Sequence, residues 1–216
     1  MAAMKGNAPQ APTVFIVDDD EAVRSSLRLL VKSVGLTAST AKSAQEFLET
    51  YDSSHPGCLV LDVRMPGMSG IELQQRLNLQ GAVIPVIFIT GHGDIPMAVE
   101  AMQQGAFDFL QKPFRDQDLV DRIQHALETD RANREQLTQR GRIDERLATL
   151  TPREREVLDL VVSGKPNKII AADLGLSQRT VEIHRAHVME KMGASSLAQL
   201  VRITLDLLDH VRGSGK

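Results

Sequence analysis

Polar side chains follow four apolar stretches in the first half of the chain, each at the point where the stretch ends. Each stretch has the continuous hydrophobicity of a strand that is covered on both faces of a sheet. The carboxyl ends of parallel strands in an open α/β sheet converge on one crevice, so we expect these side chains to meet there. They are Asp18, Asp19 and Asp20, then Asp62, Thr90 and Lys112.

These residue types are suited to phosphoryl transfer. Crowded carboxylates repel one another, and a hard divalent cation with oxygen ligands relieves that repulsion, which favours Mg²⁺ in a shallow site. Lys112 offers a point charge for phosphate oxygens, Thr90 a hydroxyl donor, and a carboxylate can act as the nucleophile. Taken singly, each residue is more simply a helix cap or a solvated loop residue. No glycine-rich phosphate-binding motif follows a strand, which disfavours a nucleotide site.

Hydrophobic periodicity predicts the elements that position these side chains. Ser43 with Glu46, and Ser69 with Glu72, have the spacing of capping boxes that begin two helices. Strands that alternate with helices predict an α/β domain with a doubly wound, five-stranded parallel sheet. The expected strands are residues 13–17, 36–40, 59–61, 85–89 and 106–110. The expected helices are residues 21–33, 44–51, 70–79 and 95–104, with a last one from about residue 116.

The last third of the chain has the pattern of a small all-α domain of four helices. Thr151, Pro152 and Glu154 combine an N-cap, a proline at the first helical position and a capping glutamate. Residues 152–163, 167–174, 178–192 and 197–211 are the expected helices. The short turn at 175–177 joins the second helix to the third, which predicts a helix-turn-helix.

The third of these helices, residues 178–192, is the expected recognition helix. Val181, Val188 and Met192 share one side and should face the core. Ile183 and Ala186 are apolar residues on the opposite, solvated face, where they could contact thymine methyl groups in a major groove or be harmless exposed residues. Arg179, Glu182 and Glu190 share this face. The candidates for phosphate contacts are Lys165, Asn167, Lys168, Thr180, His184, Arg185, His187 and Lys191, with a packed structural role as the alternative for His184.

The segment between the two halves is predicted to be largely helical. Its pattern carries no proline or glycine until Gly141, which is expected to break the helix before a restart near residue 143. The charges, Arg131 and Arg134 among them, are interpreted as a solvated face. The predicted bounds are 12–128 for the first domain, 129–147 for the linker and 148–212 for the second domain.

Composition bounds the class of protein. With 42% hydrophobic and 25% charged residues, the chain is an ordinary globular protein, and its one cysteine, Cys58, is expected to be buried in a reducing compartment. Residues 1–128 carry a net charge of −6 and residues 151–216 one of +2, which suggests different partners for the two ends. The start lacks the apolar core of a signal peptide, and no run approaches the roughly 18 apolar residues that span a bilayer. We expect a cytoplasmic protein with no membrane association.

In its first half the chain resembles the receiver domain of two-component response regulators, which has a flavodoxin-like fold. The motifs are Val17-Asp18-Asp19, Leu61-Asp62-Val63-Arg64-Met65-Pro66-Gly67, Thr90-Gly91 and Lys112-Pro113-Phe114. The resemblance implies that Asp62 is the phosphoacceptor for a sensor histidine kinase. It implies that Asp19, Asp62 and the backbone carbonyl of Arg64 hold Mg²⁺, assisted by Asp18. It also implies that Lys112 pairs with the phosphoryl group, that Thr90 and Phe109 are switch residues, and that Lys112-Pro113 is a cis bond.

In its last third the chain resembles the LuxR-type DNA-binding domain. The motifs are Thr151-Pro152-Arg153-Glu154, Asn167-Lys168-Ile169-Ile170-Ala171 and Arg179-Thr180-Val181-Glu182-Ile183-His184-Arg185. A receiver joined to this domain is typical of the NarL/FixJ family, which implies promoter DNA and RNA polymerase as partners. Residues 91–102 are similar to the FixJ subfamily, which implies a receiver that dimerises on phosphorylation through its fourth helix and fifth strand. Taken by their helical spacing alone, Ile95, Val99 and Met102 are more simply core residues.

The sequence therefore predicts a phosphorylation-activated transcriptional regulator and not an enzyme, beyond the family's own Mg²⁺-dependent phosphorylation and dephosphorylation at Asp62. A phosphotransferase or phosphatase that passes through an aspartyl-phosphate is a competing hypothesis. Val63 and Arg64 follow Asp62 and no second carboxylate lies two residues on, which disfavours fast turnover. A ligand-gated DNA-binding protein is a second competing hypothesis, and a regulator that is active without phosphorylation is a third.

Overall fold

A computed structural model describes residues 11–91 and 95–204 of the chain. The chain divides into two compact units, Met1–Glu135 and Gln136–Lys216, and each is described by itself. Among the described residues, no helix is both long enough and apolar enough to cross a membrane.

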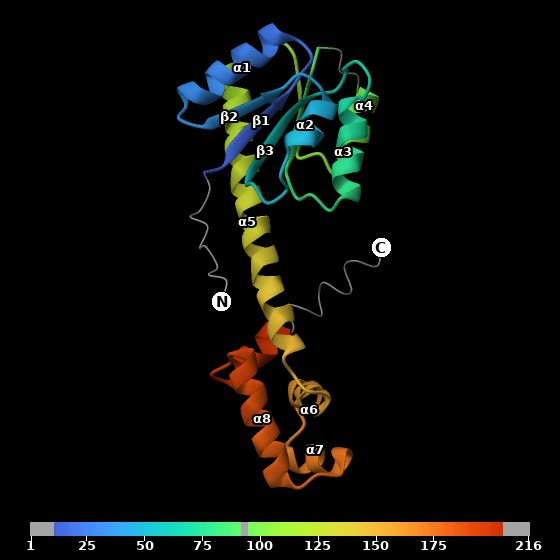
Figure 1. Ribbon diagram of the computed structural model, residues 1–216, viewed down its shortest axis with the longest axis vertical. Coiled ribbons are helices and arrows are strands. Elements are labelled where there is room, and N and C mark those ends of the chain that lie inside the picture. Colours follow the sequence, from blue (N-terminus) through green and yellow to red (C-terminus); the bar gives the residue numbers. More distant parts are fainter. Residues whose placement is uncertain (1–10, 92–94, 205–216) are drawn as a thin grey trace. The chain divides into compact units, whose positions relative to one another are not determined.

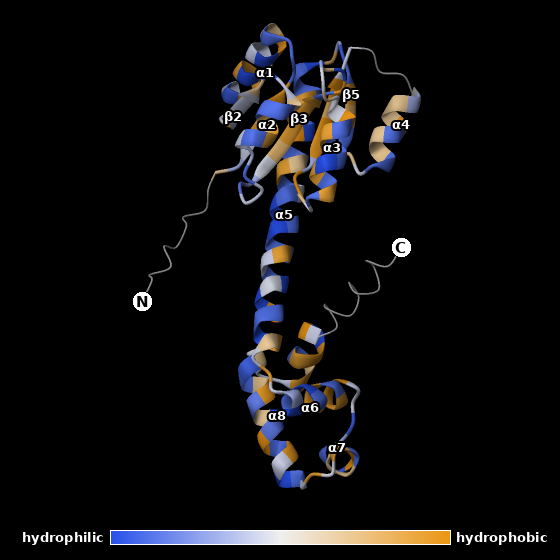
Figure 2. Cartoon of the chain, turned by 45° about the vertical axis from the view of Figure 1, so that its right-hand side comes forward, coloured by the Kyte–Doolittle hydropathy of each residue, from blue (hydrophilic) through white to orange (hydrophobic). Residues whose placement is uncertain are grey.

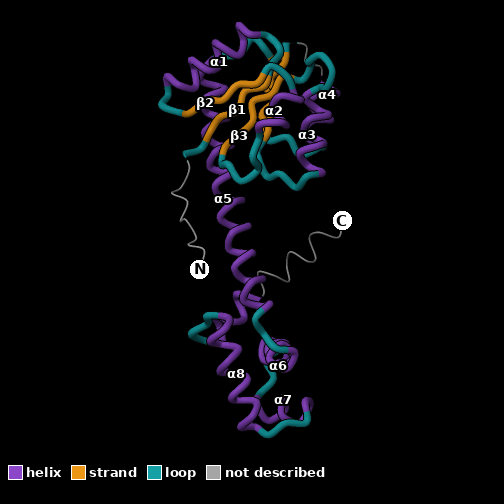
Figure 3. The backbone as a smooth tube through the Cα atoms, in the orientation of Figure 1, coloured by secondary structure: helices purple, strands orange, loops and turns teal. Residues whose placement is uncertain are grey.

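The first unit is built on a five-stranded parallel sheet, as the sequence predicts (Figures 1 and 3). The strand order is β2-β1-β3-β4-β5. From β1 the chain adds β2 on one side and then β3, β4 and β5 on the other, so the order of addition reverses between β1 and β3. Such a reversal opens a crevice at the carboxyl ends of those strands. The strands are β1 (Thr13–Val17), β2 (Thr37–Ala41), β3 (Gly57–Asp62), β4 (Val86–Thr90) and β5 (Asp108–Gln111).

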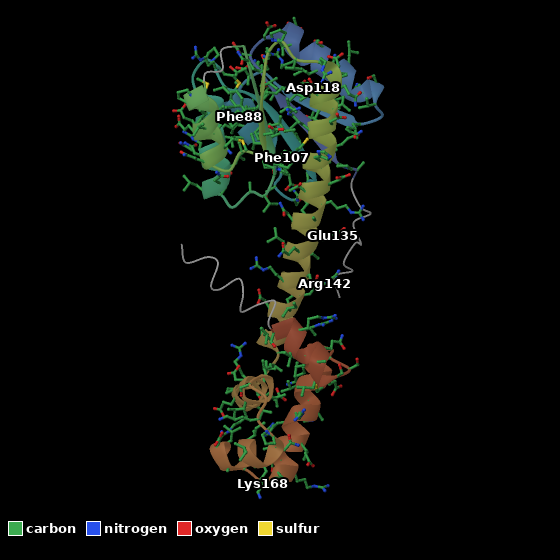
Figure 4. All side chains as sticks on the ribbon, turned by 180° about the vertical axis from the view of Figure 1, so that it is seen from behind. Phe88, Phe107, Asp118, Glu135, Arg142 and Lys168 are labelled. Carbon is green, nitrogen blue, oxygen red and sulfur yellow. The ribbon has the colours of Figure 1, made fainter. Side chains whose placement is uncertain are left out.

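Helices cover both faces of this sheet, and each face has its own apolar core. Leu27 and Val31 of α1 pack with Leu119 and Ile123 of α5 on one face. The other face packs against α2, α3 and α4 around Phe88, whose side chain lies inside the unit in Figure 4. In Figure 2 the central strand β3 has the orange of hydrophobic residues, whereas the edge strand β2 is pale. The helices are α1 (Glu21–Ser33), α2 (Ala44–Thr50), α3 (Gly70–Leu79), α4 (Ile95–Gln103) and the first part of α5 (Asp116–Ala148).

The predicted elements are all present, with small shifts at their ends. The largest shifts are of two residues. Strand β3 begins at Gly57 rather than at residue 59, and β5 begins at Asp108 rather than at residue 106, because Ala106 still bonds back to the end of α4. The capping box at Ser69 and Glu72 is confirmed. The box predicted at Ser43 is only half formed, because the Glu46 carboxylate accepts from Lys42 N rather than from Ser43 N. Cys58 is buried, as expected.

The second unit packs its helices around a single core. Its elements are α6 (Pro152–Val162), α7 (Asn167–Leu174) and α8 (Gln178–Met192), followed by helical residues 197–204. Val181, Val188 and Met192 are fully buried, as predicted, and Ile143 at the end of α5 joins the same core. Gly175 closes α7 in the left-handed conformation that a tight turn requires. The remainder of the predicted last helix lies outside the described residues.

The connector differs from the prediction at Gly141, which does not break the helix. Helix α5 is continuous from Asp116 to Ala148 and passes through Gly141. An interior glycine costs a helix only about 1 kcal/mol relative to alanine, a cost that the flanking helix formers can offset. A Cβ added at Gly141 would meet nothing within 4 Å, so packing does not demand a glycine there. Gly141 is therefore a local weak point in an intact helix.

Replacing Gly141 with alanine is expected to strengthen α5 by about 1 kcal/mol, because the new methyl group meets no neighbour and the backbone loses freedom. Amide hydrogen exchange of residues 136–142 should slow by roughly fivefold, which is the same free energy expressed as a rate. Gln139→Ala, at an exposed position of the same helix, is the matched control and should change exchange much less. Unchanged or faster exchange in Gly141→Ala would contradict the expectation.

The second unit contains a buried carboxylate, Glu154, near the start of α6. Glu154 closes the predicted capping box with Thr151, and its Oε2 accepts from Lys191 Nζ at 2.6 Å. His187 Nδ1 lies 3.5 Å from the other carboxylate oxygen. The hydrogen bonds from Lys191 and from the Thr151 backbone lower the pKa of Glu154 from 4.5 to about 2. The ionised carboxylate therefore joins the start of α6 to the end of α8.

Because the pKa of Glu154 is lower in the folded state, its contribution to stability is present above pH 4.5 and is lost as the pH falls towards 2. We expect Glu154→Gln to lack this part of the acid destabilisation of the second unit. Chemical denaturation of the full chain, followed by circular dichroism across that pH range, measures it. Glu156→Gln, which removes an exposed pair with Arg153, should keep the wild-type pH dependence. Parallel pH profiles for wild type and Glu154→Gln would count against this role.

Candidate phosphorylation site and DNA-binding helix

The structure brings together side chains from three strand ends at the carboxyl edge of the sheet. Lys112, just after β5, places its Nζ 2.9 Å from Asp18 Oδ2 and 3.1 Å from Asp62 Oδ1. Asp18 follows β1 and Asp62 ends β3, and these strands are hydrogen-bonded neighbours in the sheet. Residues that are 44 to 94 positions apart in the sequence therefore form one ion-paired cluster.

Both carboxylates of this cluster are buried and held by backbone groups. Asp18 is only 2% exposed, and its Oδ1 accepts from the backbone N–H of Asp20. Asp62 Oδ2 accepts from the backbone N–H of Arg64 at 2.8 Å, which directs the other oxygen towards Lys112. Burial raises the pKa of Asp62, and the hydrogen bond from Lys112 only partly opposes that effect. Burial also disfavours the Lys112 ammonium, but its bonds to Asp18 and Asp62 prevail and raise its pKa.

The remaining predicted site residues lie on β4 and β5 or follow β1, and they differ in burial. Thr90 is buried at the end of β4, and its carbonyl accepts from Lys112 N at 2.8 Å. Phe109 in β5 is half-buried and packs against the core that Phe88 occupies. Asp19 is exposed at the strand end. Asp20 caps α1 by accepting from Ala22 N, and Lys112-Pro113 is a cis bond, as the resemblance implied.

The donor set of this cluster fits Mg²⁺. Asp18 and Asp62 share the single charge of Lys112, so a negative charge remains, and Asp19 adds another. Oxygen donors with residual negative charge are the ligands that Mg²⁺ prefers, and it completes its shell with water. In the described part of the chain, no three acidic, histidine or cysteine side chains converge closely enough to hold a metal by themselves. A site here would therefore need backbone oxygen and water as well as carboxylates.

Helix α4 presents apolar side chains to solvent. Val99 and Met102 are each 47% exposed and line a shallow hollow with Ala98 and Gln103. The interpretation of these two residues as core residues is therefore wrong; Ala101 takes that place in the core. His92 and the side chain of Ile95 lie outside the described residues.

Helix α8, which the sequence predicts as a recognition helix, separates its two faces as predicted. Its exposed side carries Arg179, Glu182, Ile183, Ala186 and Glu190, opposite the three buried residues. Ile183 is 48% exposed, a large apolar side chain among polar neighbours. The turn from α7 is short, and Ser177 caps α8 by accepting from Thr180 N. Among the described residues of the second unit, none buries this face of α8.

The candidate phosphate contacts differ in how far their side chains are already engaged. Lys168 is exposed on α7 and is labelled in Figure 4. Lys165 pairs with Asp173 at the surface, and Arg185 donates to Asn167 across the helix-turn-helix. Lys191 is held by Glu154 and by the carbonyl of Thr149.

The two histidines among the candidates also have structural surroundings. His187 lies beside Glu154. His184 is half-buried, and its Nδ1 is buried without a hydrogen-bond partner among the described residues. Sequence reasoning missed the partnership of Lys191 with Glu154, because nothing local in the sequence marks a pair separated by 37 positions.

Comparison with known proteins places both units. The model of the response regulator receiver domain matches residues 14–124, and that of the LuxR family of bacterial regulatory proteins matches residues 148–204. The transcriptional regulatory protein FixJ of Azorhizobium caulinodans is 48% identical over 197 residues, 91% of this chain and 93% of that protein. The response regulator TodT of Pseudomonas putida is 44% identical over 200 residues, 93% of this chain and 88% of that protein.

Solved structures give the same result. The low-resolution structure of the response regulator StyR covers 90% of this chain and 98% of that one, with 46% identity and a TM-score of 0.82. Full-length FixJ from B. japonicum covers 91% of this chain and 97% of that one, with 42% identity and a TM-score of 0.56. The chain therefore belongs to the NarL/FixJ family of two-component response regulators, transcriptional regulators in which a receiver domain precedes a LuxR-type DNA-binding domain.

Proposed function

We propose that the protein is switched on by phosphorylation of Asp62 by a sensor histidine kinase and then binds promoter DNA as a dimer. The observation that carries this proposal is the buried Asp62 carboxylate at the end of β3, joined to Asp18 through Lys112. A carboxylate nucleophile with a cation beside it and a surplus of negative charge is the arrangement that phosphoryl transfer requires.

In the transfer, an Asp62 oxygen attacks the phosphorus of a phosphohistidine. The new P–O bond forms as the P–N bond breaks, and the kinase imidazole leaves. Lys112 then pairs with the phosphoryl oxygens that replace the lost carboxylate charge. Asp19, Asp62 and the backbone carbonyl of Arg64 would hold Mg²⁺, with Asp18 assisting through water; the ion would neutralise charge on the transferring group. The chain itself is a regulator, and its phosphorylation chemistry serves as a signal.

The switch that follows would run through Thr90 and Phe109. Both lie on strands adjacent to the site, and Phe109 is opposite Phe88 in the register of β4 and β5. A Thr90 hydroxyl that moves towards the phosphoryl group would leave space for Phe109 to reorient. Phosphorylation can shift this equilibrium only because the group contacts the two states differently.

Dimerisation would use the face that includes α4. Val99 and Met102 expose an apolar hollow there, and burial of apolar area is the main driving force of protein association. A receiver dimer would bring two DNA-binding domains to two half-sites, which multiplies affinity through effective concentration. The proposal also includes RNA polymerase as a partner at the promoter and a cytoplasmic location for the protein.

On DNA, α8 would enter the major groove. Ile183 and Ala186 would contact thymine methyl groups, while Arg179 and Glu182 would reach base edges. The phosphate contacts would come from Lys168, Lys165, Thr180, Arg185 and Asn167. The weaker candidates, because of their structural surroundings, are Lys191, His184 and His187. We keep 12–128, 129–147 and 148–212 as the proposed bounds of receiver, linker and DNA-binding domain.

Replacing Asp62 with asparagine is expected to abolish the response to phosphorylation, because an amide cannot accept the phosphoryl group. The response is measured as the change in DNA affinity by gel-shift titration, on the DNA upstream of the target genes, with and without acetyl phosphate and Mg²⁺. Wild type should gain at least about tenfold in affinity on phosphorylation, roughly 1.4 kcal/mol, and Asp62→Asn should gain nothing. Identical binding under all conditions would remove the switch and leave a regulator active without phosphorylation.

Two substitutions should separate base reading from phosphate contact. Lys168→Ala is expected to weaken binding to every DNA sequence. It should also reduce the slope of log K against log salt concentration by about one, because one phosphate contact is lost. Ile183→Ala should instead relax the preference for particular bases while leaving the salt dependence unchanged. Fluorescence anisotropy with operator and scrambled duplexes across a salt series measures both effects. A uniform loss in both variants would refute the assignment of α8 to base reading.

A further inference from the structure

A buried ion pair fastens α5 to the opposite end of the sheet from the phosphorylation site. Asp130 is 1% exposed, and both its oxygens accept from Arg134 Nε, at 2.9 and 2.8 Å. Oδ2 also accepts from the backbone N–H of Gly57 at 2.9 Å. The Arg134 side chain is only 20% exposed, so the interpretation of Arg134 as part of a solvated face is wrong.

The Arg134 guanidinium also binds the loop before β3. Its two terminal nitrogens donate to the carbonyls of Ser53, Ser54 and His55, at 2.9 to 3.1 Å. One planar cation therefore satisfies three loop carbonyls and a buried carboxylate, a fork geometry that arginine provides and lysine cannot. The loop is fixed further by Thr13, whose hydroxyl lies 2.9 Å from His55 Nε2.

Strand β3 connects this ion pair to the phosphorylation site. Gly57, which bonds to Asp130, is the first residue of β3, and Asp62 is the last. The six-residue strand spans roughly 17 Å. Gly57 is tightly packed, since a Cβ there would lie 2.0 Å from the Thr13 carbonyl oxygen. The amino end of β3 is therefore held firmly between β1 and α5.

The position of the pair in the chain is informative. The receiver family match ends at residue 124, before Asp130 and Arg134, so the contact lies in the connector. The first compact unit ends at Glu135, one residue after Arg134. The labels of Glu135 and Arg142 in Figure 4 mark the part of α5 that follows. The contact thus sits where α5 leaves the receiver.

We propose that Asp130 and Arg134 are positioning residues that clamp the connector helix to the amino end of β3, so that α5 up to Glu135 follows the strand carrying the phosphoacceptor. The clamp transmits the state of the receiver to the connector. The signalling role of the clamp rests on the proposed function. Its anchoring role depends only on the contacts of Asp130 and Arg134 described above.

The same helix offers a matched control. Arg131 and Glu135 form an ion pair with the same four-residue spacing, but their side chains are 82% and 67% exposed and bind no loop carbonyl in the described structure. An exposed pair of this kind contributes little to stability. Arg131→Ala therefore removes a cation from α5 without removing the clamp.

The test compares full-length wild type with Arg134→Ala, Arg134→Lys and Arg131→Ala by hydrogen exchange and by DNA binding. In Arg134→Ala, amides of the 53–57 loop and of residues 130–135 should exchange at least about tenfold faster. Its gain in DNA affinity on treatment with acetyl phosphate and Mg²⁺ should fall, while its affinity without phosphorylation stays at the wild-type value. Arg134→Lys, which keeps a cation beside Asp130, should be intermediate and remains informative if the alanine variant does not fold. Arg131→Ala should match wild type in both measurements.

The two measurements separate the two parts of the proposal. Wild-type exchange in both Arg134 variants would overturn the clamp itself. Faster exchange with an undiminished gain on phosphorylation would overturn its role in transmission. If wild type shows no gain on phosphorylation, the proposed function fails, and the exchange rates still decide whether the clamp exists.

Discussion

The bridge from Lys112 to Asp18 and Asp62 is the interaction on which the first unit's chemistry depends. Bringing two carboxylates together inside a protein is costly, and a shared ammonium offsets part of that cost. The three side chains come from the ends of three different strands, so the bridge exists only if the parallel sheet has its full topology. In turn, its charge balance is incomplete, because two carboxylates share one ammonium, and a negative charge remains at this edge of the sheet.

Strand β3 carries Asp62 at its carboxyl end and also contacts helix α5 at its amino end. It is buried along its whole length and has a polar anchor at each end, Asp130 at the amino end and Lys112 at the carboxyl end. A strand packed on both faces transmits displacement because the surrounding core resists compression. The connector helix begins in the same core, through Leu119 and Ile123, and then gains the polar contact at Arg134. Apolar packing and a buried ion pair therefore fix successive turns of one helix.

The second unit uses a buried carboxylate for a structural purpose. Glu154 caps α6 and holds Lys191 near the end of α8, so the two helices are joined by charge as well as by the apolar core. Lys191 also binds the carbonyl of Thr149, just beyond α5. On the other side of α8, Arg179, Glu182 and Ile183 are exposed.

The sequence by itself determined the alternation of strands and helices, the polar residues at strand ends and the two faces of α8. Each of these is a local pattern, because hydrophobic period and capping residues act within a few positions. Only the tertiary structure decided that Arg134 binds a loop 80 positions away, that Glu154 holds Lys191, and that Val99 and Met102 face solvent. It also decided that α5 runs through Gly141, since packing at both ends of a helix outweighs a single unfavourable residue. The sequence does not show whether a given charged or apolar residue is solvated or buried, because its contacts come from distant positions that only the fold brings together.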